Sequence, residues 1–372
     1  MKVLHINSYF STSGLFKNLY DRQVSQGLDI EVYVPIPYDY PAERLAASGD
    51  YTFVDRNHPR ISRYIFHWKH YLILNQLNKH YELPSYDLVH AHSLFSNGWL
   101  AWRIFKKYRV PYVVAVRNTD IRTFFEKMPW LRSTGLRILS DASEIILISQ
   151  NSYDELFEKY IPKRLQKEIQ SKTRVLTNGI DDFWHNHQPA QPHTQVHQPL
   201  RIVTTGKVSA IKRFEHLAKT LDIYQENVGP VELHVIGPNW DDQILTRLEK
   251  HPFVHYHGAK TMPEIANIYR QMDIFALVSH PETFGLVYPE AMSQGLPVIY
   301  TKNEGFDSFF ENYYIGVSVQ REDPQELMVA IDHIVDHYEE LVERTQKNCR
   351  LFNWDDIAQK YLTIYQEILK EK

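Results

Sequence analysis

The sequence has little of what disulfide-bonded or membrane-spanning proteins need. Its 372 residues include one cysteine, Cys349, which permits neither an internal disulfide nor a cysteine metal cluster. No apolar run approaches about 18 residues, and this excludes a membrane-spanning helix. The first ten residues (MKVLHINSYF) hold a short apolar stretch interrupted by His5 and Asn7, which predicts a first strand and no signal peptide. We therefore expect a cytoplasmic location.

The length of the chain predicts two domains, and its two halves differ in net charge. A chain of 372 residues is too long for one ordinary core, so two domains are expected. Residues 1–190 hold 24 Lys and Arg against 19 Asp and Glu, or +5, and the remainder holds 17 against 26, or −9. The basic half favours an anionic membrane surface or acceptor, and the acidic half does not suit nucleic acid. An ordinary scatter of solvated charge is the alternative.

The stretch from Asp273 to Thr301 predicts a parallel β/α unit. Its residues indicate a strand over 274–279, a loop, a helix entered near Pro289 and a strand over 298–301. The loop carries Glu282, and the first helical turn carries Glu290. Amides at this helix start would face an anion, and the residues expected to supply them are Gly285, Leu286 and Val287, which follow Phe284. The alternative is that Glu290 complements the helix dipole and Glu282 is a solvated loop charge.

Other predicted strands also end in residues that can bind ligands. These residues are Gly14 after the first strand, His90, His92 and Ser93 where the strand that begins at Asp87 runs into a loop, Arg117, Asn118 and Asp120 at and after the end of 112–117, Gly206, Lys207 and Lys212 at and after the end of 200–206, and Gly237 at the end of 231–237. Two histidines two apart on a strand share one face and could bind a metal, but no third ligand follows at usable spacing. The four histidines of residues 184–199 lack an accompanying acid, so we predict a linker there and no metal site.

Residues 36–81 are the least regular part of the first half. Residues 36–60, rich in Pro, Tyr and Asp, predict an irregular excursion over the surface. Residues 61–81 alternate aromatic, basic and aliphatic side chains at helical spacing. Such a helix could lie on a membrane or line an acceptor cleft, and core packing with exposed basic edges is the reading we favour.

Several motifs together resemble one enzyme family. ETFGLVYPEAMSQGLPVI (282–299) joins two acids with seven residues between them to a phosphate-facing glycine and a helix exit in one register. DLVHAH (87–92), NGID (178–181) and GKVSAIK (206–212) follow the same pattern. The chain is similar to retaining GT-B glycosyltransferases of family 4, also called group 1 glycosyl transferases.

The resemblance implies an α/β GT-B fold with two Rossmann-like doubly wound domains facing each other across a cleft. It implies an acceptor-binding domain over 1–184, a linker over 185–199, a nucleotide-sugar domain over 200–352 and a helix over 353–372 that packs back on the first domain. Glu290 would bind the ribose and Glu282 the sugar hydroxyls. The diphosphate would lie against Lys207, Lys212 and residues 284–287, with Gly206, Gly237 and Gly14 also on the donor side.

The resemblance places the acceptor beside His90, His92, Ser93 and the loop that holds Asn118. Asp120 matches the family, whereas Arg117 stands where relatives often have a histidine that faces the transferred sugar. An arginine stays cationic and cannot act as a base, so it could bind an acidic sugar, a phosphate or a carboxylate, or be structural. With Glu282 and the two lysines, Arg117 and Asp120 complete the predicted catalytic set.

The sequence contains no D-x-D pair, which metal-dependent transferases of the other main architecture use on the diphosphate. We therefore expect a metal-independent hexosyltransferase with no cofactor. Its donor would be a nucleotide-diphosphate sugar, with UDP as the expected nucleotide. Its acceptor would be a glycan or a lipid-linked glycan of bacterial surface polysaccharide, met at the inner face of the membrane. The alternatives are an epimerase or hydrolase of the same fold and a non-catalytic partner subunit.

Overall fold

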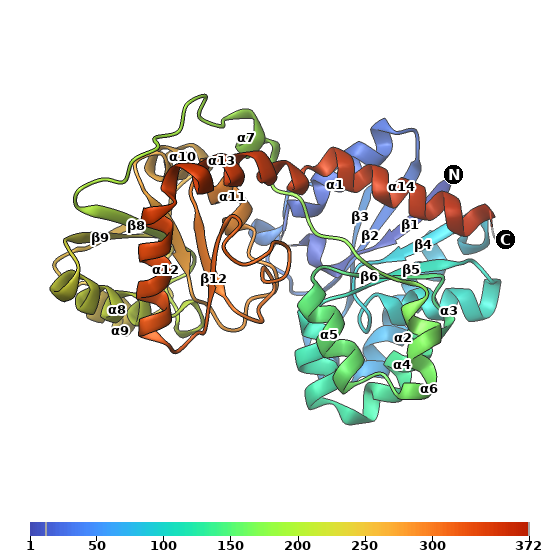
Figure 1. Ribbon diagram of the computed structural model, residues 1–372. Coiled ribbons are helices and arrows are strands. Elements are labelled where there is room, and N and C mark those ends of the chain that lie inside the picture. The colour runs from blue at the N-terminus through green and yellow to red at the C-terminus, as the bar shows by residue number, and fades with distance from the viewer. Residues whose placement is uncertain (12, 371–372) are drawn as a thin grey trace. The chain divides into compact units, whose positions relative to one another are not determined.

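The computed structural model describes residues 1–11 and 13–370. The chain forms two compact units (Figure 1). The first holds Met1–Ile148, Ser152–Thr177 and the C-terminal helix, and the second holds Ser149–Asn151 and Asn178–Asn353. No helix within the described residues combines the length and the apolar character needed to cross a bilayer.

The first unit is built on a sheet of seven parallel strands in the order β3-β2-β1-β4-β5-β6-β7. The strands are β1 (Lys2–Ile6), β2 (Asp29–Pro37), β3 (Thr52–His58), β4 (Leu88–Ala91), β5 (Tyr112–Val116), β6 (Glu144–Leu147) and β7 (Thr173–Val175). Its helices are α1 (Leu15–Ser25), α2 (Phe66–His80), α3 (Gly98–Tyr108), α4 (Arg132–Asp141), α5 (Gln150–Lys159), α6 (Lys163–Gln170) and α14 (Trp354–Lys370). The strand order reverses direction between β1 and β4.

The second unit repeats this plan with six parallel strands in the order β10-β9-β8-β11-β12-β13. The strands are β8 (Leu200–Thr205), β9 (Val231–Ile236), β10 (Val254–Gly258), β11 (Ile274–Leu277), β12 (Val298–Thr301) and β13 (Gly316–Val319). Its helices are α7 (Asp182–Asn186), α8 (Phe214–Asn227), α9 (Asp242–Leu248), α10 (Met262–Tyr269), α11 (Val287–Ser293), α12 (Pro324–Asp336) and α13 (Tyr338–Asn348). Here the order reverses between β8 and β11, and the predicted pair of doubly wound sheets is confirmed.

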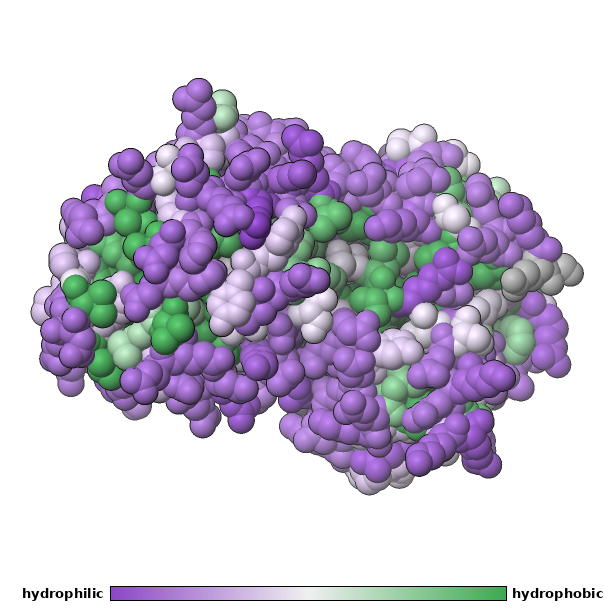
Figure 2. Space-filling view, in the orientation of Figure 1, coloured by the Kyte–Doolittle hydropathy of each residue, from purple (hydrophilic) through white to green (hydrophobic). Residues whose placement is uncertain are grey.

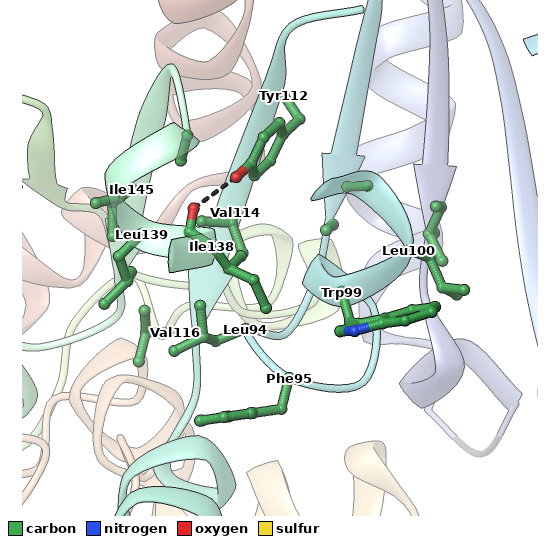
Figure 3. Packing of buried hydrophobic residues seen from close by; sticks show 14 of the residues in the cluster. Leu94, Phe95, Trp99, Leu100, Tyr112, Val114, Val116, Ile138, Leu139 and Ile145 are labelled. Atoms are coloured by element: carbon green, nitrogen blue, oxygen red, sulfur yellow. Dashed lines mark hydrogen bonds between the residues drawn. The ribbon is translucent and has the colours of Figure 1, made fainter. Parts of the chain in front are cut away.

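Strand periodicity divides the core of the first unit into two layers. In β5, Tyr112, Val114 and Val116 join a layer formed with α3 and α4. Val113 points to the opposite face. Figure 3 shows the first layer from close by, where the Tyr112 hydroxyl donates a hydrogen bond to the Ile138 carbonyl at 2.5 Å. Because both faces are covered, the strands read as continuous apolar runs.

The C-terminal helix covers the second layer. Buried residues of α14 recur at helical spacing, and they are Trp354, Ile357, Ala358, Tyr361, Ile364, Tyr365 and Ile368. They pack in one cluster with apolar residues of α1, β1 and β2. An ion pair of 2.6 Å between Arg22 and Asp355 ties the start of α14 to α1. The predicted return of the last helix to the first domain is confirmed.

The prediction of an irregular segment over residues 36–60 is wrong in part. Residues 52–58 form β3, an edge strand parallel to β2. Among the described residues β3 pairs with β2 alone, and its sequence, TFVDRNH, is largely polar, as is common for an edge strand. It therefore lacks the apolar signal of a central strand. The buried Asp55 carboxylate accepts hydrogen bonds from the Tyr33 hydroxyl at 2.6 Å and from the Asn57 amide at 2.8 Å. The strand is therefore held by polar contacts.

The predicted linker is attached to the second unit along much of its length. The imidazoles of His193 and His197 donate to one oxygen of the buried Asp273 carboxylate, at 3.2 and 2.7 Å. Asp273 also accepts from the amides of His197 and Arg201, at 3.1 and 2.7 Å. Burial alone would raise the pKa of Asp273, but these hydrogen bonds outweigh burial and hold its pKa below the ordinary value. The expectation that no acid accompanies the linker histidines is wrong, because Asp273 bonds two of them. The linker sequence did not reveal this acid, since Asp273 lies far away in the chain.

We predict that Asp273→Asn destabilises the second unit. The asparagine side chain keeps the shape but replaces one acceptor oxygen by a donor, which leaves buried amide or imidazole donors without a partner. The expected loss in the free energy of unfolding is about 1–3 kcal/mol, measured by urea unfolding of the whole chain. The exposed Asp336→Asn on α12 is the matched control and should change the value by less than about 0.5 kcal/mol. Equal stabilities of the two variants would contradict the assignment.

Candidate active site

The candidate donor residues lie where the second sheet reverses its strand order. In a parallel sheet, the carboxyl ends of all strands meet at one edge, and the helices leave in opposite directions at the reversal. The loop after β8 carries Lys212, and the loop after β11 carries Glu282. Since β8 and β11 are neighbours, the fold brings Lys212 and Glu282 together although they are 70 positions apart in the sequence.

Lys212 and Glu282 form an ion pair in this position. The Lys212 ammonium donates to Oε2 of Glu282 at 2.6 Å, and both side chains keep part of their surface exposed, 22% and 12%. Ser279 at the end of β11 donates to the same oxygen at 2.9 Å, and the Thr283 amide donates to Oε1 at 3.1 Å. These contacts fix the lysine and the carboxylate while leaving both reachable by a ligand.

A second acid, Glu304, supports the Glu282 loop. Its buried carboxylate accepts the Glu282 amide at 2.6 Å and bonds the imidazole of His280. A Cβ atom on the neighbouring Gly305 would lie 1.9 Å from the Thr283 carbonyl oxygen, so only glycine fits there. The sequence alone did not identify Glu304 as a support of this loop. The position of Glu304 could have indicated this role, because it follows β12, which lies beside β11 in the sheet.

The turn before α11 requires its glycine. Gly285 has φ +83°, and an added Cβ would lie 2.4 Å from the Tyr288 ring. The Phe284 side chain is buried against Phe306 and Phe309, so only its backbone can face a ligand. Packing of the Phe284 and Tyr288 side chains thus holds the backbone of residues 285–287, where the chain enters α11. Binding of a diphosphate by this backbone stays a prediction.

Glu290 in the first turn of α11 is half-buried and carries the most perturbed carboxyl group of the second unit. Burial, with a smaller contribution from the charge of Asp181, raises the pKa of Glu290 to about 8. Within the described residues, no side chain or amide donates a hydrogen bond to this carboxyl group. A ligand that donates hydroxyl groups would favour its ionised form, which suits the predicted contact with ribose.

Lys207 does not join the Lys212–Glu282 pair. It is exposed, and its ammonium lies 3.7 Å from the centroid of the Trp240 ring. Trp240 is 67% exposed and follows β9, and sequence reasoning missed it. Gly206 and Gly237 lie beside each other at the ends of β8 and β9, where a Cβ on Gly237 would lie 2.0 Å from the Gly206 carbonyl oxygen. The close approach that requires Gly237 is thus to the chain itself, which differs from the predicted approach to a ligand.

In the first unit, Asp120 positions two loops. Its buried carboxylate accepts the amides of Leu94, Phe95 and Arg117 at 2.9, 3.0 and 2.9 Å. Burial raises the pKa of Asp120 to about 6, against the effect of these hydrogen bonds and of the Arg117 charge. A carboxylate so engaged holds the ends of β4 and β5 in place. A direct part for Asp120 in the reaction stays a prediction.

The Nε atom of Arg117 holds its side chain in place. Nε donates to the His92 carbonyl at 3.1 Å, and the guanidinium lies 5.6 Å from the centroid of the Phe16 ring. The side chain is 9% exposed. An arginine held in this way presents a fixed cation at the carboxyl edge of the first sheet.

The predicted acceptor contacts of the two motif histidines are wrong. Strand geometry places His90 and His92 on one face as expected, but α1 and α14 cover that face and leave both side chains with no exposed surface. His90 hydrogen-bonds the Tyr365 hydroxyl at 2.6 Å, and His92 lies 3.1 Å from both His5 and the Tyr20 hydroxyl. Burial, followed by the charges of nearby histidines and Arg117, holds the pKa of His90 and of His92 well below the ordinary value.

The other predicted acceptor-side residues have different surroundings. The Ser93 hydroxyl is buried and accepts the Asn97 amide at 3.1 Å, so it also serves the interior. Asn118 remains partly exposed. Gly14 precedes α1 with φ −69°, and an added Cβ would meet no atom of the described residues within 4 Å. Only a ligand could require glycine there, which leaves that prediction open.

Among the described residues, three groups of side chains could hold a metal ion by distance alone. They are His5 with His90 and His92, His193 with His197 and Asp273, and Glu232 with His234 and His255, each with ligand atoms within 4.8 Å. His5 is the third ligand that the sequence did not reveal, because it reaches His90 across the β1–β4 pairing. In the second group, both histidines hydrogen-bond the Asp273 carboxylate. In the first group, one ring nitrogen of each histidine takes part in a hydrogen bond within the fold, and the other is buried with no hydrogen-bond partner among the described residues. These hydrogen bonds give the histidines of both groups a structural role.

Comparison with known families shows which protein family this chain belongs to. The model of the glycosyl transferases group 1 family matches residues 189–352, and that of Glycosyltransferase Family 4 matches residues 15–182. The chain belongs to these glycosyltransferases. A D-inositol 3-phosphate glycosyltransferase of Corynebacterium kroppenstedtii is 22% identical over 312 residues, covering 78% of this enzyme and 69% of that protein.

Solved structures confirm the two-domain GT-B fold of this glycosyltransferase. The sucrose-phosphate synthase of Thermosynechococcus elongatus matches with a TM-score of 0.76 at 16% identity, covering 100% of both chains. HepE of Anabaena in complex with UDP matches with a TM-score of 0.73 at 18% identity, covering 99% of this chain and 100% of that one. At such identities the likeness shows the fold alone.

The raised pKa of Glu290 predicts how nucleotide binding by this glycosyltransferase depends on pH. If the ionised carboxylate accepts the ribose hydroxyls, binding must release the proton that Glu290 holds below a pKa of about 8. Affinity for UDP should therefore rise between about pH 7 and pH 9, by about tenfold, and then level off. Isothermal titration calorimetry across this range measures the slope, together with the proton release. Glu290→Gln, which cannot ionise, should bind with no such slope, and an unchanged slope in that variant would refute the assignment.

Proposed function

We propose that this glycosyltransferase moves a sugar, with retention of anomeric configuration, from a nucleotide-diphosphate sugar to a glycan or lipid-linked acceptor. The observation that carries the proposal is the Lys212–Glu282 pair at the strand-order reversal of the second sheet. A diphosphate needs a cation there, and a sugar needs a hydrogen-bond acceptor beside it. The pair supplies both within 2.6 Å.

UDP is the nucleotide we propose. Among the similar structures, HepE of Anabaena was solved with UDP and with UDP-glucose, and these ligands belong to that protein. In this chain, Glu290 is proposed to bind the ribose hydroxyls and Lys212 the diphosphate. Lys207 would add a second cation if its side chain leaves the Trp240 ring. Trp240, exposed beside it, offers an aromatic face at the same edge.

The proposed reaction needs no metal ion. The bond between the anomeric carbon and the diphosphate oxygen breaks, and the leaving diphosphate takes the bonding electron pair. Lys212 is proposed to stabilise that charge electrostatically. A hydroxyl oxygen of the acceptor forms the new bond on the same face of the sugar, and its proton passes to the leaving phosphate. The sequence supports this route because it lacks a D-x-D pair.

The acceptor is proposed to bind at the carboxyl edge of the first sheet. Arg117 replaces the usual histidine as a fixed cation there, which favours an acceptor or sugar with an anionic group. A growing surface polysaccharide or a lipid-linked glycan at the inner face of the membrane meets this description. These choices rest on the family and on the charge of Arg117.

The first experiment is calorimetric binding of UDP, GDP, ADP and TDP to the intact chain, with EDTA and then with magnesium. We expect one nucleotide, UDP, to bind in EDTA with an affinity that magnesium leaves unchanged. Failure of all four nucleotides to bind would refute the donor site. Binding that depends on magnesium would refute the metal-independent route.

A variant tests the ion pair itself. Lys212→Ala removes a charge-assisted hydrogen bond to the diphosphate, so affinity for the nucleotide should fall by about tenfold or more. Lys219→Ala on the exposed face of α8 removes the same charge nearby and is the matched control, with little expected effect. Equal affinities in the two variants would place the diphosphate elsewhere. Melting temperatures show whether both variants remain folded.

A further inference from the structure

A run of large apolar side chains lies exposed at the start of α2. Five of them are between 41% and 72% exposed, and they are Ile61, Tyr64, Ile65, Trp68 and Tyr71. Single exposed apolar residues are ordinary on a protein surface, but five within eleven positions are not. Hydrophilic side chains predominate on the face of the molecule that Figure 2 shows. We call residues 60–71 the α2 entry surface.

The packing of α2 explains why these side chains stay exposed. The helix buries His70, Ile73 and Leu77, which lie on one face at spacings of three and four. Trp68 and Tyr71 project from other sides of the helix. Ile61 and Tyr64 belong to the short 3-10 turn (Arg60–Tyr64) that leads into α2. The sequence favours core packing for residues 61–81, and this prediction is confirmed only for the face of α2 that carries His70, Ile73 and Leu77.

The charges around this surface have one sign. Residues 56–81 contain no acidic residue, and their basic residues are Arg56, Arg60, Arg63, Lys69 and Lys79. The neighbouring helix α3 also lacks acids and places the Arg103 guanidinium 5.9 Å from the Tyr71 ring centroid. Two nearby acids offset part of this charge, since Asp39 pairs with Arg60 at 3.2 Å and Asp141 pairs with Lys106 at 3.3 Å, but the basic residues outnumber them. The surface thus combines exposed apolar groups with a net positive charge.

We propose that the α2 entry surface docks this chain on an anionic lipid bilayer. Tryptophan and tyrosine favour the boundary between lipid headgroups and acyl chains, where isoleucine can insert further. Arginines around them attract anionic headgroups, and residues 56–81 carry no acid that would repel those headgroups. A protein partner would need a complementary acidic and apolar face, for which this chain gives no indication. The bilayer is therefore the occupant that fits both features.

The proposal deepens the proposed function, because a lipid-linked acceptor resides in such a membrane. It does not depend on the donor site or on sugar transfer. Binding to vesicles can be measured without any nucleotide. Failure of one proposal therefore leaves the other open to its own test.

The test is co-sedimentation of the intact chain with vesicles of phosphatidylcholine, with or without phosphatidylserine. We expect binding to the anionic vesicles only, and weaker binding as salt screens the headgroups. The double variant Arg60→Gln, Arg63→Gln should lower the vesicle affinity by about tenfold or more. The double variant Tyr64→Ser, Trp68→Ser should lower it by a similar factor, because apolar insertion is lost.

Matched controls alter the same chemistry elsewhere. Lys163→Gln with Arg164→Gln removes two exposed charges at the start of α6, and Val329→Ser removes a side chain on α12 that is 57% exposed. Both should bind vesicles as the unaltered chain does. The proposal is overturned if the unaltered chain binds neither kind of vesicle, or if the surface variants bind as well as the controls. Self-association that the surface variants abolish, without vesicle binding, would assign the surface to a second copy of the chain.

Discussion

Parallel strands deliver all their carboxyl ends to one edge of a sheet, and the candidate donor site depends on that constraint. Lys212 and Glu282 are 70 positions apart, yet they meet at 2.6 Å because β8 and β11 are neighbours at the reversal of strand order. Helices that leave in opposite directions keep the space above these strand ends open. A charged pair at such a position is held by the sheet and still reachable by a ligand.

Buried carboxylates hold the loops around these strand ends. Asp120 accepts three amides in the first unit, Glu304 fixes the Glu282 loop, and Asp273 fastens the linker. Each satisfies backbone donors that would be costly to bury alone. Glu282 and Glu290 differ, because part of each side chain remains exposed. Exposure therefore separates the acids that serve the fold from those available to a substrate.

Much of the fold could be predicted because its signals are local. Apolar runs marked the central strands, and helical spacing marked α2. The edge strand β3 was missed because its polar sequence carries no burial signal. The motif around Glu282 predicted a loop and a helix start, and the structure has both. The support from Glu304 was missed because a hydrogen bond between two loops produces no recognisable sequence pattern in either loop.

The sequence by itself determined the family, the two doubly wound units and the positions of residues at strand ends. The strand ends follow from periodicity, and the motifs carry a resemblance to the family that implies its two doubly wound units. Periodicity and motifs are both properties of short segments. Only the tertiary structure decided which of those residues remain accessible. His90 and His92 share a face as predicted, but helices from the two ends of the first unit cover it. Trp68 lies in a helix as predicted, but its side chain is 41% exposed. Burial is set by segments distant in the chain, so no local pattern can reveal it.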